Sequence, residues 1–473
     1  MNVDNNICVS KSKFGSHGYE FNDICGMVSY LKEIIYSNVS SVVERCDKHE
    51  DYIWIDTKYN VIDGLEYQID DKIHGQNTIY AWIQGRGIEA LAGHISYLKK
   101  YHGNESTALV GQIRNILKLI LFQLSKIRAQ CGGHVYFFMD QSGTPFTFDE
   151  SGNRKPTVLT TQSPYNFSDL FCAKGMYAAA KTTENHDLAS EARKYCLDVT
   201  KAIQTYTIVS DQYQFDKNNP VGQVTGRKSH ASFMIQIGAM ALMVSHEKDN
   251  SFVETGLKLI EYVLDNYVNT KNKFSKLEEF DFVEFLDSEN QPWSQDGKII
   301  SDPGHALEFV GLAFKFTDTV KRLRITDCDQ KNRLCRIESV LPKIFKQNFR
   351  NGFQPQLGGI CKLFDLITRN PINSDMPWWS LPETIRAALY CWQNEPSVSA
   401  KQNYLEIANE CSRCFKLNYI VSERDMMPIQ NRCGDGKIAH TIPAIPDNDP
   451  CYHTGLSLID SVEIISNLFT VHD

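Results

Sequence analysis

Residues 28–43 read VSYLKEIIYSNVSSVV, and their apolar side chains recur at the spacing of an amphipathic helix. Val28, Leu31, Ile35, Val39 and Val42 share one stripe, because positions three and four apart lie on the same face of a helix. The same spacing returns in segment after segment, whereas the alternation typical of a half-buried strand is scarce. The sequence therefore predicts an all-α protein.

The helical pattern extends over most of the chain. We expect helices at about residues 28–47, 77–101, 106–130, 166–182, 186–209, 229–246, 250–268, 304–323, 332–348, 379–393, 398–418 and 452–470. Several connections between them carry Gly, Pro and Asp and are long enough for small hairpins. Long loops on one face of a helical scaffold usually hold the functional site.

We expect one catalytic domain over residues 1–473, with residues 1–27 as an N-terminal extension. No linker rich in Pro, Ser or charge divides the chain, and it has no strict repeat. About a dozen helices are predicted, and the amino-acid composition does not change along the chain. This suggests six antiparallel hairpins closed into a ring, an (α/α)6 barrel with small hairpins in its long loops. An open solenoid of helical hairpins is the alternative.

Charge and hydropathy argue against two classes of partner. The net charge is -8, from 57 acidic and 49 basic residues spread along the chain, so no basic tract could follow a nucleic-acid backbone. No stretch resembles a signal peptide, and no uninterrupted apolar run reaches about 18 residues. We therefore expect a cytoplasmic protein that binds neither nucleic acid nor membranes.

The 14 cysteines fit a reducing compartment, because many lie in apolar helical segments where a thiol acts as a small hydrophobe. Cys411 and Cys414 have the C-x-x-C spacing of some zinc sites, and Cys433 and Cys451 could supply the other half of one. The pair lies within a predicted helix, however, and no second C-x-x-C follows. We interpret it as a buried structural pair and expect no bound metal.

The stretch Ser301-Asp302-Pro303-Gly304-His305 marks the start of a helix. Asp302 is a good N-cap and Pro303 suits the first helical position, so His305 should lie in the first turn. The positive helix end disfavours imidazolium, and we expect a neutral, base-competent His305. Glu308 shares its face and could orient the imidazole or bind a substrate hydroxyl. Alternatively, both residues only cap and solvate the helix.

Two further stretches carry residues suited to sugars. Trp378 and Trp379 precede a helix that begins near Glu383, so that one ring could pack in the core and the other face a cleft. Arg86 lies in an apolar helix, where a buried guanidinium must meet an anion, a polyhydroxyl group or an ion-pair partner such as Glu89.

Near the end of the chain stands Asp449-Pro450-Cys451-Tyr452-His453. With the stretches above, it resembles in order the N-acylglucosamine 2-epimerase family of (α/α)6-barrel sugar epimerases and isomerases. The resemblance runs from about residue 50 to 460. It includes Gln84-Gly85-Arg86, a Gly132-Gly133 turn, Pro303-Gly304-His305-x-x-Glu308, Trp378-Trp379-x-x-x-Glu383 and Tyr452-His453.

The resemblance implies roles for these residues. His305 and His453 would be the acid/base pair, and Arg86, Glu308 and Glu383 would bind and polarise the sugar. Trp379 and Tyr80 are further candidates for sugar binding. The implied reaction requires no cofactor or metal, although some relatives bind ATP as an effector. A homodimer is expected. The chain departs from the family at Gly87-Ile88-Glu89, at Leu456, and near Ile235, where Arg227 or His230 could replace a histidine of the isomerase and cellobiose-epimerase branches.

The reaction implied is removal of the C2 proton of an open-chain aldose and its return to the opposite face of an enediolate, most simply on N-acylglucosamine and N-acylmannosamine. Aldose–ketose isomerisation, as in a mannose isomerase, is the nearest alternative. Glycoside hydrolysis would need a carboxyl pair such as Glu308 and Glu383. A sugar-binding relative without catalysis is the remaining class.

Overall fold

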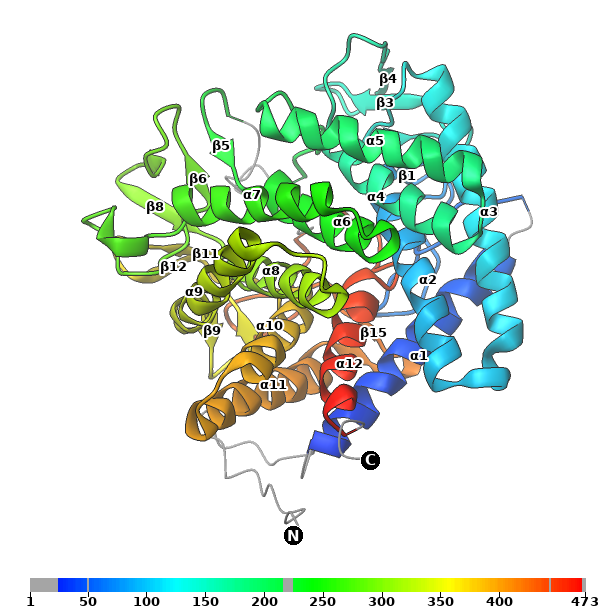
Figure 1. Cartoon of the computed structure of the whole chain (residues 1–473). Helices are drawn as coiled ribbons and strands as arrows, with labels where there is room; N and C mark the ends of the chain where they lie inside the picture. Colours follow the sequence, from blue (N-terminus) through cyan, green and yellow to red (C-terminus); the bar gives the residue numbers. More distant parts are fainter. Residues whose placement is uncertain (1–23, 49–50, 216–223, 442–443, 470–473) are drawn as a thin grey trace.

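The computed structural model describes residues 24–48, 51–215, 224–441 and 444–469 (Figure 1). Its α-helices are α1 (Ile24–Lys48), α2 (Ala81–Tyr101), α3 (Thr107–Gln130), α4 (Phe167–Thr182), α5 (His186–Gln204), α6 (Ala231–Glu247), α7 (Asn250–Asn266), α8 (Pro303–Leu323), α9 (Cys328–Gly352), α10 (Ser380–Asn394), α11 (Val398–Asn418) and α12 (Leu458–Phe469). Short 3-10 turns are η1 (Gly103–Ser106), η2 (Thr270–Asn272) and η3 (Ser422–Arg424), and η4 (Tyr452–Ser457) is a π-helix.

The mostly helical fold is confirmed, and each predicted helix has a counterpart. The last predicted helix, 452–470, is only partly α-helical, because it begins with the π-helix η4 and α12 follows. Residues 205–209, predicted to extend α5, lie outside it: the helix ends at Gln204 and Tyr206 takes a left-handed φ of 57°. Residues 1–23 of the predicted extension lie outside the described residues, whereas 24–27 begin α1.

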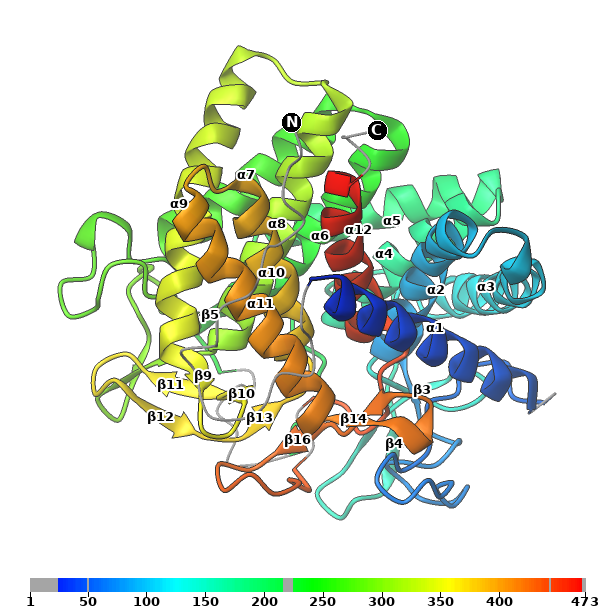
Figure 2. The ribbon, with the colours of Figure 1, turned by 90° about the horizontal axis from the view of Figure 1, so that it is seen from below.

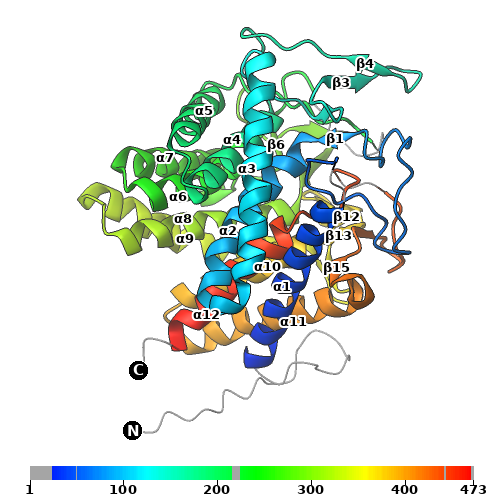
Figure 3. The same cartoon turned by 90° about the vertical axis from the view of Figure 1, so that its right-hand side faces the viewer.

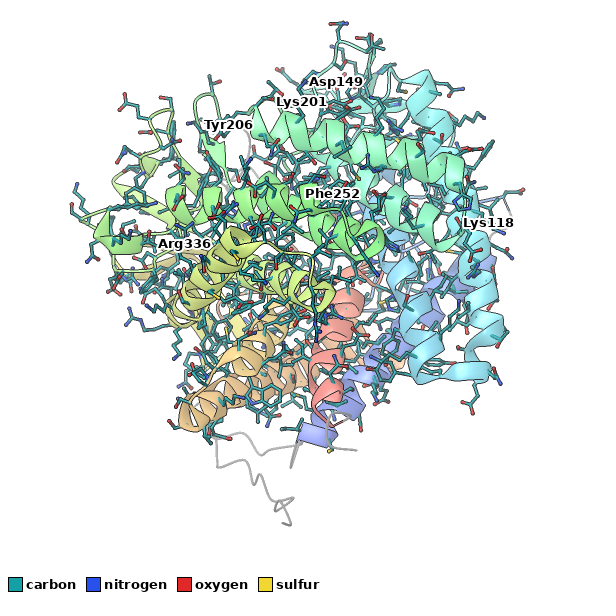
Figure 4. All side chains as sticks on the ribbon, in the orientation of Figure 1. Lys118, Asp149, Lys201, Tyr206, Phe252 and Arg336 are labelled. Carbon is teal, nitrogen blue, oxygen red and sulfur yellow. The ribbon has the colours of Figure 1, made fainter. Side chains whose placement is uncertain are left out.

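The even-numbered helices form an inner ring. α2 packs on α4, α4 on α6, α6 on α8, α8 on α10 and α10 on α12, while η4 contacts both α12 and α2 and so returns to the start. The odd-numbered helices pack outside them, and α1 and α3 face the viewer in Figure 3. Figure 4 labels Lys118, Lys201 and Arg336 on three of these outer helices, where all three are exposed.

Sequence patterns explain which helices are inside. In α4 every residue from Ser168 to Ala180 is buried, and α6 is buried from Ser232 to Ala241, as expected for helices that are surrounded by protein. The outer helices α5, α7 and α9 instead bury one stripe and leave polar residues in solvent. Hydrophobic residues from both layers belong to one continuous core.

The two ends of the ring differ. We call the end where the inner helices begin the front, and the opposite end the rear. At the rear, outer helices follow inner ones through short connections, residues 102–106, 183–185, 248–249, 324–327 and 395–397. At the front the connections are long, residues 49–80, 131–166, 205–230, 267–302, 353–379 and 419–451. Figure 2 shows the ribbon from below, with α12 between α10 and α1.

All the strands that the structure describes lie in these front connections and pair antiparallel. One sheet holds β1 (Ile79–Tyr80), β2 (Phe138–Met139), β3 (Pro145–Phe148) and β4 (Arg154–Pro156). Another holds β7 (Ser294–Gln295), β8 (Lys298–Ser301), β11 (Leu363–Asp365) and β12 (Asn370–Asn373). Pairs join β5 (Lys228–Ser229) to β6 (Phe285–Leu286), β9 (Phe353–Gln354) to β10 (Gly359–Ile360), β13 (Met376–Pro377) to β16 (Asn431–Arg432) and β14 (Ile420–Val421) to β15 (Met427–Pro428). The predicted hairpins are therefore present and surround the front opening.

Cys411 and Cys414 are buried on α11, as the helical pattern predicted, and the Cys414 thiol faces the Glu410 carboxylate. Across the described ranges, no helix combines the length and apolar run needed to cross a bilayer.

Candidate active site

A cavity of about 340 Å³ opens at the front end of the inner ring. Its wall includes Arg86 of α2, His305 and Glu308 of α8, Trp379 directly before α10, and His453 of η4. These residues come from four distant segments of the sequence, and each lies in the first turns of an inner helix or just before one. The ring therefore brings five of the predicted site residues to one place.

His305 lies in the first turn of α8, as predicted. Asp302 caps the helix, with its Oδ1 accepting a hydrogen bond from the His305 backbone N at 3.3 Å, and Pro303 takes the first position. The imidazole Nδ1 lies 3.1 and 3.2 Å from the two carboxylate oxygens of Glu284. Because Nδ1 is held in this way, Nε2 is the ring atom left for a substrate, and the side chain is 22% exposed.

The expected neutral state of His305 was wrong. Burial alone would lower the pKa of this imidazole, but the charges of Asp302 and Glu284 outweigh burial and raise the pKa to about 9. The negative charges of two carboxylates within 3.4 Å of Nδ1 favour the imidazolium. They outweigh the partial positive charge of roughly half a unit at the helix N-terminus, which disfavours it. His305 is therefore an imidazolium, a proton donor, at neutral pH.

Glu284 was missed by the sequence analysis. It lies just before β6, is 3% exposed, and also contacts His230 Nε2 at 3.1 Å. Burial opposes its ionisation, yet the two imidazoles hold the pKa of the carboxyl well below its ordinary value. The available signal was the single charge in the apolar run Phe282-Val283-Glu284-Phe285-Leu286, since a buried charge needs a partner.

His230 and Arg227 were predicted as possible replacements for a substrate-contacting histidine. The structure places His230 behind Glu284, fully buried and outside the cavity wall. Arg227 does line the cavity, with its guanidinium 3.9 Å from the ring centroid of Phe285. Only Arg227 is thus placed to meet a ligand.

His453 is backed by a carboxylate as well. Its Nδ1 lies 2.8 Å from Glu383 Oε1, which also accepts a hydrogen bond from Ser457 Oγ at 2.5 Å, while Oε2 pairs with Arg386. Burial would raise the pKa of Glu383, but Arg386 and these hydrogen bonds lower it to about 2. Asp449 accepts from the His453 backbone N at 3.3 Å and fixes the start of η4. Single π turns of this kind are frequent at functional sites.

Glu308 faces the cavity from the turn after His305. Of the two roles suggested for Glu308, holding the His305 Nδ1 falls to Glu284. Its carboxylate lies in a cluster with Glu383 and His453 whose ligand atoms are all within 4.8 Å of one another. Burial and the charge of Glu383 raise the pKa of Glu308. No hydrogen bond to this carboxylate is formed within the described ranges.

Arg86 packs on aromatic rings rather than in an ion pair. Its guanidinium lies 4.2 Å from the ring centroid of Phe171 and 5.7 Å from that of Tyr452. Glu89, the suggested partner, instead pairs with Lys174 at 2.9 Å. Burial lowers the pKa of Arg86, and its Nε has no hydrogen-bond partner in the part of the chain that the structure describes. The guanidinium is therefore available to a substrate oxygen.

The two tryptophans were expected to separate, with one ring in the core and the other facing a cleft, and the structure differs. Both Trp378 and Trp379 line the cavity, although Trp378 is only 6% exposed and meets His453 edge-on. Tyr80 is fully buried outside the cavity wall, and its hydroxyl donates to the Ile73 carbonyl at 2.8 Å. The structure does not bring Tyr80 to the site.

Comparisons with known proteins show the family and the fold of the chain. The sequence model of the N-acylglucosamine 2-epimerase (GlcNAc 2-epimerase) family matches residues 148–454. No curated protein matches the chain. Among solved structures, a sugar epimerase from a ruminal bacterium is 12% identical, with 92% of this chain and 98% of that chain covered and a TM-score of 0.62.

Two further structures are similar to the same extent. Cellobiose 2-epimerase from Bacillus thermoamylovorans B4167 is 12% identical over 92% of this chain and 99% of that chain, with a TM-score of 0.63. A D-mannose isomerase is 12% identical over 92% and 97%, with a TM-score of 0.59. At such identities the likeness shows a shared fold.

Proposed function

The chain belongs to the N-acylglucosamine 2-epimerase family, and from this premise we propose that it is a sugar 2-epimerase acting on N-acylglucosamine and N-acylmannosamine or a related aldose. The observation that carries the proposal is the pair of histidines on one cavity. His305 and His453 each present one ring nitrogen to a buried carboxylate, Glu284 and Glu383 respectively. This arrangement leaves Nε2 of each ring for proton transfer.

In the proposed reaction, His453 Nε2 takes the C2 proton of the open-chain aldose. The electron pair of the broken C–H bond forms the C1–C2 double bond, and negative charge moves to O1. His305, protonated at rest because of Asp302 and Glu284, then donates its Nε2 proton to the other face of C2. The double bond re-forms as the C1 carbonyl, so the net change is inversion at C2 without a redox step.

Electrostatics at the front end support an anionic intermediate. The inner helices all begin there, and their N-termini carry partial positive charge. Arg86, with its unpaired Nε, supplies a full positive charge for O1. Trp379 offers a flat face to the sugar ring.

We also propose that the ring of inner helices is the closed (α/α)6 barrel of this family. The order of contacts from α2 to α12 and back through η4 supports closure. An open solenoid would leave its first and last inner helices apart, whereas here η4 joins them.

Aldose–ketose isomerisation is the second candidate, because the same deprotonation at C2 followed by protonation at C1 would give a ketose. A hydrolase is less well supported. Both oxygens of Glu383 are occupied, by His453 and Ser457 on one side and Arg386 on the other, and Glu383 does not line the cavity. The other carboxylates of the cavity wall, Glu284, Asp447 and Asp449, are held in the same way, by His305, Lys58 and Thr454 respectively.

The test is incubation of free hexoses, N-acetylhexosamines and acidic sugars with the protein in heavy water, followed by NMR. A 2-epimerase yields the C2 epimer with deuterium at C2, an isomerase yields a ketose, and a hydrolase leaves reducing monosaccharides unchanged. If no sugar binds or reacts, the proposal is wrong, and binding without turnover identifies a non-catalytic relative. An ATP effector site and a homodimer remain predictions of the family resemblance.

A further inference from the structure

A two-base epimerase has to reset its proton donors after each turnover. When His453 has taken a proton and His305 has given one, the two rings have exchanged protonation states. The next substrate of the same configuration needs the original states. Either exchange with solvent or a second protein group must therefore move one proton from His453 back to His305, and the structure contains a candidate for such a group.

A second cavity of about 580 Å³ lies inside the inner ring, toward the rear. Its wall includes charged pairs such as Lys174 with Glu89 at 2.9 Å and Lys315 with Asp460 at 2.9 Å. A polar space of this size favours water. Within the described ranges, Glu308 and Tyr452 alone line both this rear cavity and the front cavity. These two side chains form the wall between them.

Of the two, Tyr452 is unsuited to proton transfer. Its hydroxyl accepts a hydrogen bond from Lys174 Nζ at 3.1 Å, and burial followed by the Glu89 charge raises its pKa to about 12. A phenol with that pKa keeps its proton at neutral pH. The remaining group in the wall is the Glu308 carboxyl.

Glu308 is placed to reach both histidines. It lies three residues after His305 on α8, so the two side chains share a helix face. On the other side, its carboxylate is within the 4.8 Å cluster with His453. The rear cavity gives the ionised carboxylate a hydrated side, while burial and Glu383 make its protonated form accessible.

We propose that Glu308 returns the proton from His453 to His305 between turnovers. The N–H bond of the protonated His453 breaks as an O–H bond forms on the Glu308 carboxylate. That O–H bond then breaks as an N–H bond forms on the neutral His305, so no proton or electron pair is gained or lost. The inference rests on the proposed two-base epimerisation, because a single-base isomerase needs no return step.

The test compares one turnover with many in Glu308→Gln, which keeps the shape of the side chain but cannot carry a proton. With enzyme in excess and pre-equilibrated in buffer, the single-turnover rate should fall much less than the multiple-turnover rate, because the chemical step itself uses the histidines. With substrate in excess, turnover should fall at least about tenfold, because the reset is lost. Formate added to Glu308→Ala should restore a large part of the multiple-turnover rate and leave the first turnover unchanged.

Asp318→Asn is the matched control. Asp318 also lines the rear cavity, but it lies ten residues further along α8, roughly 15 Å away, and bonds to Arg322 and Gln393. Both rates should be unchanged in this variant. Equal losses of single and multiple turnover in Glu308→Gln would assign Glu308 to substrate binding, and no loss in either would remove it from the reaction. Both results overturn the proton return, whereas a wild-type protein that inverts no sugar overturns the proposed function itself.

Discussion

The indole of Trp379 contacts both histidines: its ring centroid lies 5.3 Å from that of His305, with 26° between the ring planes, and 5.8 Å from that of His453. One aromatic side chain thus spans the two histidines to which proton transfer is proposed. A charged imidazole against an indole face is stabilised by the ring quadrupole. Trp379 therefore helps to set both the separation of the histidines and the charge of His305.

Removing this contact should impair catalysis more than folding. We expect Trp379→Ala to lower turnover at least about tenfold, since misplaced catalytic groups commonly cost one to two orders of magnitude. Trp379→Phe, which keeps an aromatic face, should retain more activity. The control is Trp392→Phe on α10, away from the cavity wall, and it should turn over normally. Equal activity of Trp379→Ala and wild type would contradict the role of the indole.

The two histidines should be separable by isotope exchange. His305→Asn and His453→Asn should each lower epimerisation by at least about 10²-fold, the usual scale for a lost general acid or base. Each variant should still exchange the C2 proton of the epimer that its remaining histidine faces, without inverting it. In His453→Asn this exchange should become faster as pH rises toward about 9, where His305 loses its proton. Proton NMR in heavy water measures both rates. Near-normal turnover in both variants would exclude the histidine pair.

The helix positions could be predicted because each outer helix shows a clear apolar stripe and each inner helix an extended apolar surface. His305 was placed correctly by Asp302 and Pro303, whose capping roles are local. Its charge was not, because Glu284 comes from another connection and only the folded chain brings it to Nδ1. Lys362 was missed for the same reason: it pairs with Asp302 at 2.6 Å from 60 residues away.

The pH dependence should report the pKa of His305. Since the acid form is the active one, kcat/KM in the direction where His305 donates should fall as pH rises through about 9. In Glu284→Gln one of the charges that raise this pKa is lost, so the alkaline limb should move to lower pH. Asp365→Asn, a carboxylate held by Thr368 outside the cavity wall, should leave the limb in place. An unmoved limb in Glu284→Gln would show that another group titrates there.

Chelation tests whether the carboxylates and histidines act without a metal. Two clusters, His230 with Glu284 and His305, and Glu308 with Glu383 and His453, contain residue types that bind metals. We interpret both as proton-transfer clusters, because the imidazole nitrogens already pair with the carboxylates at 2.8 to 3.2 Å. Full activity is expected after exhaustive EDTA treatment. Activity lost with EDTA and restored by a divalent cation would overturn this interpretation.

The unequal ends of the helical ring have a consequence for how such a protein can be altered. The long front connections carry or flank the substrate cavity, whereas the rear turns 183–185, 248–249 and 395–397 contain no residue of its wall. Segments exchanged between relatives at the front should therefore change which sugar is accepted. New chain ends opened at the rear turns should leave acceptance unchanged. The segments that surround the cavity and the turns where the chain can be opened thus lie at opposite ends of the ring, so that one can be changed without the other.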